Sequence, residues 1–567
     1  MKAIMRFFTT VTMLVCFHCS FVLAQTNIIL EALDEELNRS LTELKEKGEA
    51  PLYYLGYTIT DKQDFVLTAT FGALYNKIDS HVRFLDIDIR VGDYKFDNTH
   101  ELRGGYSSLL SLLGSPAARI TIENDIDAIK NVIWRETDKA FKNEQKQFTN
   151  LKTNVAVKVE EEDQSDDFSI EPPQIHSEAI LPLKIDEASW VEKLKSFSAM
   201  FKESPHIYTG QVTLEVNRLE KFIIDSEGTK LQTGHYHIWI RCLVRTIAED
   251  GMSISLNRIF FAPNWEKVPS DEEIRQGIRS LISELEQMKE ASYVEPYIGP
   301  AILLNRASAV FFHEIFGHRV EGHRQKSVLE GQTFAKKVGE FVLPEFINIY
   351  DDPSLESYGE FDLAGHYNYD DEGVKASRVS IVEEGVLKNF LMSRSPIEGF
   401  SNSNGHGRRD YGRKTVARQG NLVIESSNAV AFDELKKLLI EECNKQDKPY
   451  GLIFTDISGG FTTTQRIGPQ SFKVIPLVVY KVYADGRPDE LVRGVDIVGT
   501  PLTSFSKIIA TSNDYNVFNG FCGAESGSLP VSCISPSMLV SEIEVEKKIR
   551  AQDKPPILPS PIHKKIK

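Results

Sequence analysis

The stretch "FFHEIFGHRVEGH" sets two histidines, His313 and His318, around a glutamate, Glu314. Zinc hydrolases use two imidazoles and a carboxylate in this way, but their histidines are four residues apart on one helix face. Here the second histidine comes five positions after the first. On an ideal helix this spacing places the two side chains about 140° apart, so they could not bind the same ion. Gly317 precedes the second histidine, where the helix can end or deform into a left-handed or wider turn. Spacing alone leaves two readings open, a metal site and a solvated, charged helix end.

The segments around this motif predict a buried scaffold in a β-rich domain. "AILLNRASAVFF" begins as a strand and continues as an apolar, alanine-containing helix that ends at the motif. Strand-like runs separated by glycine follow, among them "SFKVIPLVVYKVYADG" and "ELVRGVDIVGT". Helical pattern remains only in "VAFDELKKLLIEECNK" and near 501–511. We therefore expect residues 291–546 to form a mainly antiparallel β-rich domain that carries the site.

The first half of the chain alternates helical and strand patterns. Leucines at three- and four-residue steps over 30–44 predict an amphipathic helix, and "HVRFLDIDIRVG" alternates as a half-buried strand does. Strand-like runs over 205–262 are divided by turn signals, and Ser270 predicts the start of a long helix. Residues 25–290 are thus expected to form an N-terminal α/β region. The fold class predicted for the whole chain is α+β.

Residues 1–24 predict a cleaved signal peptide, with Lys2 and Arg6 before an apolar run that ends at Ala24. We expect export, to the periplasm or by secretion, and no transmembrane segment in the mature chain. An acidic stretch near 155–178 predicts a linker or loop, and the basic, proline-rich residues 547–567 predict a flexible tail. The net charge of −16 argues against nucleic acid as a partner.

Several other residues could bind a metal or a ligand. His235 and His237 alternate on a strand, but without a third ligand beside them sheet packing is the favoured reading. His323 and His406 are candidates for contacts with substrate or with a metal ligand. Arg408, Arg409 and Arg418 could hold a carboxylate or a phosphate-like anion, and packing salt bridges explain them equally well.

The sequence from "GPAILLNRASAVFFHEIFGHRVEGH" onward resembles the TldD/PmbA family, in its metal-carrying, TldD-type branch. "YDDEGVKASRVSIVEEGVLKNFLMSR", "SNSNGHGRRDYGRKTVARQGNLVIE" and "FCGAESGSLPVSCISPSMLVSEIEV" are similar to later parts of that family, in the same order. The likeness is dense over about 295–545 and thinner over 30–290. It implies an N-terminal α/β domain, a β-rich C-terminal domain, and assembly as a homodimer or as a heterodimer with a related chain.

The resemblance also implies a metallopeptidase. His313, His318 and Cys522 would bind one metal ion per chain, usually zinc, and Glu314 would be the base that activates a metal-bound water. The expected substrates are small or unfolded peptides that pair with a sheet edge. His406, Arg408 and Arg418 are the expected substrate-binding residues.

Two alternatives to a peptidase stay open. One is a non-catalytic partner subunit or binding module, because one branch of the family lacks the metal motif. The other is a purely structural zinc, with His323 or a carboxylate closing the fourth position. A disulfide between Cys522 and Cys533 would destroy the site, and we expect Cys533 to be a spectator instead.

Overall fold

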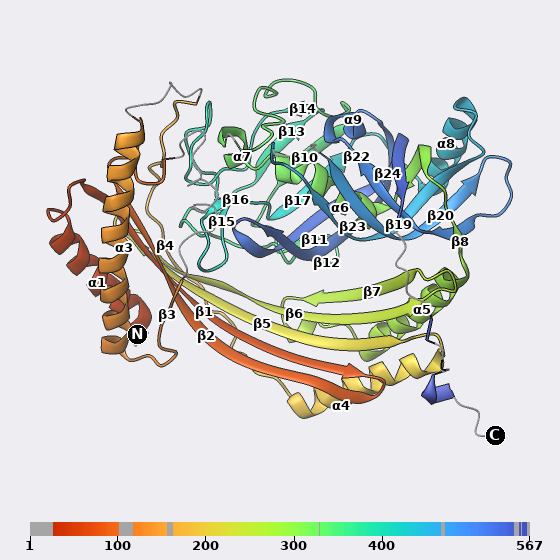
Figure 1. Cartoon of the computed structure of the whole chain (residues 1–567), viewed down its shortest axis with the longest axis horizontal. Helices are drawn as coiled ribbons and strands as arrows, with labels where there is room; N and C mark the ends of the chain where they lie inside the picture. Colours follow the sequence, from red (N-terminus) through yellow and green to blue (C-terminus); the bar gives the residue numbers. More distant parts are fainter. Residues whose placement is uncertain are drawn as a thin grey trace, which may run out of the picture.

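The computed structural model describes residues 27–100, 117–155, 163–327, 329–466 and 471–548, together with 555, 556, 558 and 560–563. The predicted signal peptide lies outside these residues, as do 156–162 of the predicted acidic loop and most of the predicted tail. Two large sheets dominate the described part, and the C-terminal one lies above the N-terminal one in Figure 1. No helix in that part of the chain is both long and apolar enough to span a bilayer.

The N-terminal sheet has seven strands in the order β3-β2-β1-β5-β6-β4, with β7 paired to β6. All its pairs are antiparallel except β4 with β6. The expected turns at Glu227-Gly228 and Asp250-Gly251 connect β5 to β6 and β6 to β7. The strands are β1 (Leu52–Thr70), β2 (Ala73–Val91), β3 (Ala118–Arg119), β4 (Ile175–Ser177), β5 (Thr209–Asp225), β6 (Lys230–Ile247) and β7 (Ser253–Ala262).

Four helices cover this sheet. Helices α4 (Glu187–Ala199) and α5 (Asp271–Glu290) lie on the face away from the C-terminal domain, and α1 (Ile28–Leu44) and α3 (Ile126–Val155) lie at one end (Figure 1). The predicted Ser270 cap of α5 is present as a capping box with Glu273. Helix α4, which we did not predict, buries Trp190, Leu194 and Phe197 at the spacing of one helix face.

The alternating strand β2 is buried on both faces near its end, rather than half-buried as expected. Asp86 and Arg90 on its polar side are 6% exposed each. The backbone N–H of Gly412, in the C-terminal domain, donates to the Asp86 carboxylate at 2.8 Å, and Phe84 stacks on Tyr411 with ring centroids 4.0 Å apart. The polar face of the N-terminal sheet is therefore a contact with the second domain, which alternation within one strand cannot reveal.

The C-terminal sheet has 13 strands, and most of its pairs are antiparallel. Its main path is β14-β13-β10-β17-β24-β9-β19-β20-β21-β8, with β18, β22 and β23 attached beside it. The strands are β8 (Ser292–Tyr293), β9 (Tyr297–Leu303), β10 (Ile347–Asp351), β13 (Val379–Glu383), β14 (Val386–Leu387), β17 (Asn421–Ser426), β18 (Ala429–Val430), β19 (Tyr450–Thr462), β20 (Phe472–Tyr483), β21 (Glu490–Arg493), β22 (Val495–Gly499), β23 (Ile508–Ala524) and β24 (Gly527–Lys547).

Short elements complete the domain around helix α6. Two small strand pairs are β11 (Ser357–Tyr358) with β12 (Phe361–Asp362) and β15 (Gly407–Arg408) with β16 (Val416–Ala417). The helices are α6 (Asn305–Ile315), α7 (His323–Lys326), α8 (Phe432–Lys445) and α9 (Pro501–Phe505). Residues of α6 from Ala307 to His313 are all buried, in the largest apolar cluster of the described chain. The helices and mainly antiparallel sheets confirm the α+β prediction.

Candidate metal centre

The motif helix ends where the sequence suggested, between the two histidines. Helix α6 ends at Ile315 with Phe316 as its cap, and a 3₁₀ turn covers Gly317–Arg319. Of the possibilities expected at Gly317, the helix ends rather than continuing through a left-handed or wider turn, because φ there is not positive and a tight 3₁₀ turn follows. A Cβ at this position would collide with the side-chain amide of Gln419, whose Nε2 donates to the carbonyl of His313 at 3.3 Å. This glycine therefore permits close packing.

The tightened turn brings three side chains together. One ligand atom from each of His313, His318 and Cys522 lies within 4.8 Å of the others, and all three residues are buried. The Sγ atom of Cys522 is 3.3 Å from Nε2 of His318, and the two imidazole centroids are 5.1 Å apart. Among the described residues, this is the one group of three or more potential ligands that meets so closely. The structure thus gathers the predicted metal ligands.

These three residues fit zinc. The Nδ1 atom of His313 is buried without a hydrogen-bond partner in the described structure, although such atoms are normally satisfied. Burial alone would raise the pKa of Cys522, but the charges of His318, His313 and Arg418 hold it well below its usual range. The site can therefore carry the thiolate that zinc requires. Two imidazoles and one thiolate leave a position open, as in catalytic sites.

Glu321 orients the second histidine. Its carboxylate is fully buried and accepts from Nδ1 of His318 at 3.2 Å and from Nε of Arg324 at 2.7 Å. Burial would raise its pKa, but the charges of His318 and Arg324 lower it to about 2. An ionised acceptor at Nδ1 leaves Nε2 of His318 free to face the sulfur and a metal.

A second set of contacts holds the sulfur. Cys522 lies near the end of β23, and Arg418 donates to its carbonyl at 2.8 Å and to Ser526 Oγ at 2.7 Å. Glu525, in the turn between β23 and β24, is bound by His323 at 2.6 Å and by Arg324 at 3.0 Å. The hairpin that carries the cysteine is therefore fastened to the segment that follows His318.

Glu314 lies beside the cluster with its carboxylate available. Its Oε2 atom is 4.0 Å from Nε2 of His318, and its side chain is 14% exposed. The described residues give this carboxylate no hydrogen bond. Its Cγ lies against Gly460 of β19, where a Cβ would come within 2.9 Å. A carboxylate next to a metal position, neither buried completely nor neutralised, is suited to accept a proton.

Of the three predicted substrate-binding residues, Arg418 alone contacts this cluster, through the carbonyl of Cys522. His406 is fully buried between Asp351 at 3.2 Å and Asn404 at 3.0 Å. Arg418 is 1% exposed and holds the cysteine hairpin, as described above. Arg408 lines a separate cavity, and His323 is engaged by Glu525.

None of the four cysteines of the described chain forms a disulfide, and Cys522 and Cys533 are among them. Burial raises the pKa of Cys533 well above its usual range, and this residue lies in the apolar core. Sequence reasoning missed the supporting residues Glu321, Arg324, Gln419 and Glu525. Glu321 and Arg324 follow the motif closely in the sequence. Their charges were the only sign in the sequence of the buried ion pairs that surround the metal centre.

Comparison with known proteins points in the same direction. Residues 297–547 match the family described as PmbA/TldA metallopeptidase C-terminal domain. A metalloprotease from Archaeoglobus fulgidus is 33% identical over 233 residues, which cover 41% of this chain and 49% of that protein. A zinc metalloprotease TldD homolog from Saccharolobus solfataricus is 26% identical over 251 residues, covering 43% of this chain and 51% of that protein. The chain thus spans about half the length of these curated relatives.

The likeness in fold extends over both domains. The crystal structure of TldE from Thermococcus kodakarensis superimposes with a TM-score of 0.59, covering 91% of this chain and all of that one at 13% identity. At this identity the match supports the fold alone. The match of residues 297–547 and the named relatives identify the C-terminal domain as one of the TldD/PmbA family, and together with the shared fold they support a TldD/PmbA-family protein.

Proposed function

We propose that this protein is an exported zinc-dependent metallopeptidase that hydrolyses peptide bonds in small or unfolded peptides. The observation that carries the proposal is the convergence of His313, His318 and Cys522 within 4.8 Å, with Glu314 beside them. The relatives named metalloprotease support the reaction class. Export is inferred from residues 1–24 alone.

His313, His318 and Cys522 would hold the zinc ion. When bound there, zinc supplies a Lewis acid that polarises a peptide carbonyl and lowers the pKa of a water molecule toward about 7. The thiolate favours zinc over harder cations such as magnesium or manganese. Glu321 keeps His318 in the tautomer whose Nε2 can act as ligand.

Glu314 is the proposed general base. Its free carboxylate can take a proton from the attacking water at Oε2 and then deliver that proton to the leaving amine. The neighbouring main chain of β19 lacks side-chain bulk at Gly459 and Gly460, so a substrate can approach the glutamate closely.

An extended peptide can be held beside this glutamate by main-chain hydrogen bonds. Strand β19 pairs with β9 only over Leu452–Phe454, whereas its pairing with β20 continues to Thr462. On the β9 side, residues 456–462 have no strand partner among the described residues. An added strand on this edge would be recognised by its backbone, which favours broad specificity.

Assembly as a homodimer, or as a heterodimer with a related chain, belongs to the same proposal. The structural likeness to TldE, whose fold this chain shares, supports the proposal of a related partner chain. A binding module without chemistry and a purely structural zinc are the competing functions, and His323 in a structural site would have to leave Glu525.

The test compares metal content and peptide hydrolysis of the wild type with those of Glu314→Gln and His318→Ala. We expect one zinc per chain in the wild type and Glu314→Gln, and hydrolysis by the wild type alone. If Glu314→Gln binds zinc and still hydrolyses peptides, Glu314 is not the general base. Zinc with no hydrolysis by any variant would favour a structural site, and absence of zinc from the wild type would favour a binding module.

A further inference from the structure

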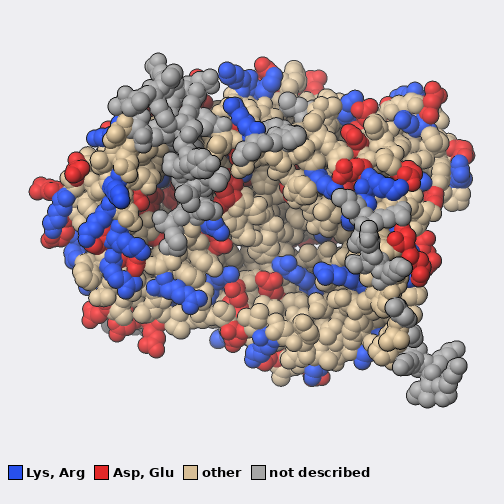
Figure 2. Space-filling view, in the orientation of Figure 1, with Lys and Arg blue, Asp and Glu red and all other residues tan. Residues whose placement is uncertain are grey.

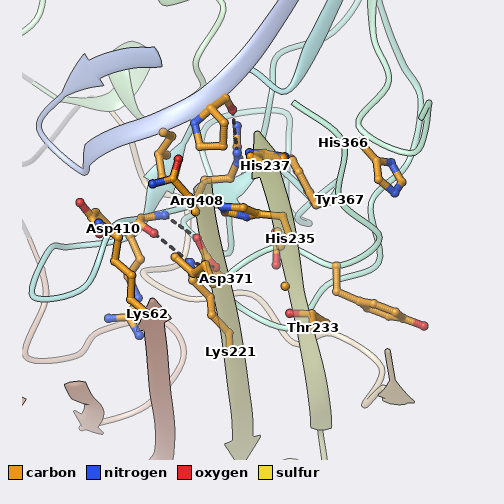
Figure 3. A pocket seen from close by; sticks show the side chains of 18 of the residues that line it. Lys62, Lys221, Thr233, His235, His237, His366, Tyr367, Asp371, Arg408 and Asp410 are labelled. Atoms are coloured by element: carbon orange, nitrogen blue, oxygen red, sulfur yellow. Dashed lines mark hydrogen bonds and ion pairs between the residues drawn. The ribbon is translucent and has the colours of Figure 1, made fainter. Parts of the chain in front are cut away.

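A cavity of about 240 Å³ lies between strands β5 and β6 and the loops of the C-terminal domain (Figure 3). In the space-filling view the surface is hollowed between the two domains, with side chains of both charge signs along the rim (Figure 2). No residue of the candidate metal centre lines this cavity. Phe521 does line it, and because Phe521 and Cys522 are consecutive on an extended strand, their side chains point to opposite faces. The cavity therefore lies on the other side of the cysteine hairpin from the metal centre.

Arg408 brings a buried positive charge to this cavity. The residue is 6% exposed, and its Nη1 and Nη2 atoms donate to the carbonyls of Gln419 at 2.6 Å and Pro530 at 3.0 Å. The ring of Tyr367 lies 4.7 Å from its Cζ. A guanidinium has five N–H donors, so donors remain for a further partner. The described residues give Arg408 no salt bridge.

Each of the other cations in the wall has a carboxylate partner. The pairs are Lys62 with Asp64 at 3.0 Å, Lys221 with Asp371 at 2.6 Å, and Arg409 with Asp86 at 3.9 Å. Among the described residues, Arg408 is thus the lining cation that forms no ion pair with a carboxylate within 4.0 Å. A buried charge without an ion-pair partner destabilises the folded protein, and a bound anion would offset that cost.

The carboxylates in the wall are also engaged by groups other than Arg408. Burial and the charge of Glu372 raise the pKa of Asp370 well above its usual range, and three backbone N–H groups donate to its carboxyl. The partners of the lining acids are Gly407 N for Asp370 at 2.8 Å, Tyr411 N for Asp410 at 2.9 Å, Arg241 for Glu215 at 3.3 Å and Asn368 for Glu178 at 2.9 Å.

Two neutral histidines from β6 stand next to Arg408 (Figure 3). The rings of His235 and His237 stack with centroids 4.2 Å apart, His237 is 5% exposed, and the described residues give neither ring a hydrogen bond. Burial and the positive charges of Lys221 and Arg408 lower the pKa of His235 to about 3. Burial likewise holds the pKa of His237 well below its usual range. Each ring is neutral at physiological pH and offers one N–H donor.

We propose that this cavity binds the carboxylate of a small molecule or of a peptide end, with Arg408 as counter-ion and the N–H groups of His235 and His237 as further donors. The planar fork of a guanidinium matches the two oxygens of a carboxylate, and Phe521 offers an apolar surface to the rest of the ligand. The site is separate from the metal centre and does not depend on peptidase activity.

Isothermal titration calorimetry on the full-length protein tests this site with four probes: N-acetylphenylalanine, its amide, benzoate and inorganic phosphate. Both carboxylates should bind, and the amide at least about tenfold more weakly. N-acetylphenylalanine binding more tightly than benzoate would identify a peptide end, and the reverse order a small organic acid. The carboxylate site is overturned if acid and amide bind alike, if phosphate binds more tightly than both carboxylates, or if no probe binds.

Variants locate the binding. Arg408→Gln should weaken the carboxylates by at least about tenfold, whereas Lys62→Gln, which removes a cation already paired with Asp64, should leave them within about twofold. His318→Ala should retain binding, which separates this cavity from the metal centre and from any failure of the proposed peptidase. If Arg408→Gln does not fold, His237→Phe is tested in its place. The proposal is overturned if either folded variant binds the carboxylate probes with the affinity of the wild type.

Discussion

The Oε1 atom of Glu525 lies 2.6 Å from Nε2 of His323, and this contact joins the turn of the cysteine hairpin to the segment that follows the second motif histidine. Arg324 donates to the other oxygen of the same carboxylate at 3.0 Å. These contacts help to hold His318 and Cys522, which are 204 residues apart in the chain, next to each other. Side chains that are fixed in this way lose less conformational entropy when they bind a metal.

The first prediction concerns Glu525. Replacing it with Gln removes the charge that holds His323 and Arg324, so the hairpin loses its tie to the histidine segment. We expect zinc affinity to fall by about 10- to 100-fold, as for other residues that orient metal ligands. Competition with a chromogenic chelator measures the change. Glu542→Gln is the control, because Glu542 lies on the same hairpin with a side chain that is 45% exposed; equal losses in the two variants would refute the role of Glu525.

The second prediction concerns Glu321. Its substitution by Gln replaces the ionised acceptor at Nδ1 of His318 and leaves the buried guanidinium of Arg324 with one carboxylate fewer. We expect weaker zinc binding and a loss of about 3–5 kcal/mol in the free energy of unfolding, the usual cost of breaking a buried ion pair. Urea unfolding of the metal-free protein measures the stability. A variant with wild-type stability and zinc affinity would show that this carboxylate is dispensable.

The third prediction concerns Gly317. Because a Cβ here would collide with the amide of Gln419, Gly317→Ala should displace that side chain and the turn before His318. We expect a loss of about 1–3 kcal/mol in the free energy of unfolding, typical of overpacking. The matched control is Gly523→Ala, where a Cβ would meet no atom within 4 Å. Equal stability of the two alanine variants would contradict the packing role.

The fourth prediction concerns pH. His235 and His237 are held neutral in the folded protein, with the pKa of His235 lowered to about 3. Between that value and about 6.5, these two histidines bind more protons in the unfolded chain than in the folded one, so their contribution to the free energy of unfolding falls as pH drops below about 6.5.

Replacing both histidines by Phe should flatten this dependence. Urea unfolding between about pH 4 and pH 7 compares the slopes. His176→Gln serves as the control, because the side chain of His176 is 37% exposed. A double variant that keeps the wild-type slope would show that other groups control acid stability.

The sequence predicted most elements that are defined by their own residues. The helix ending at His313, the capped helix after Ser270 and the glycine turns between strands each have a local cause, and the structure contains them. The helix end before His318 was among the predicted possibilities, but the tight turn at Gly317 was not, because it packs against Gln419, about 100 residues away in the chain. The burial of Asp86 was missed for the same reason, since a loop of the other domain covers it.

The candidate site divides in the same way. His313, Glu314 and His318 are visible in one short motif, whereas Cys522 was assigned only through resemblance to a family. No periodicity could connect Glu525 to His323 or place Arg408 beside His235, because these contacts arise from the packing of distant segments. The role of a buried charged residue can be assigned only when the residues that contact it are known.

Zinc K-edge X-ray absorption of the purified, metal-loaded protein tests the central claim most directly. We predict two imidazole nitrogens at about 2.0 Å and one sulfur at about 2.3 Å from the metal, with the sulfur shell absent from Cys522→Ser. A wild-type spectrum without sulfur, or a sulfur shell that survives Cys522→Ser, would contradict the assignment of this centre.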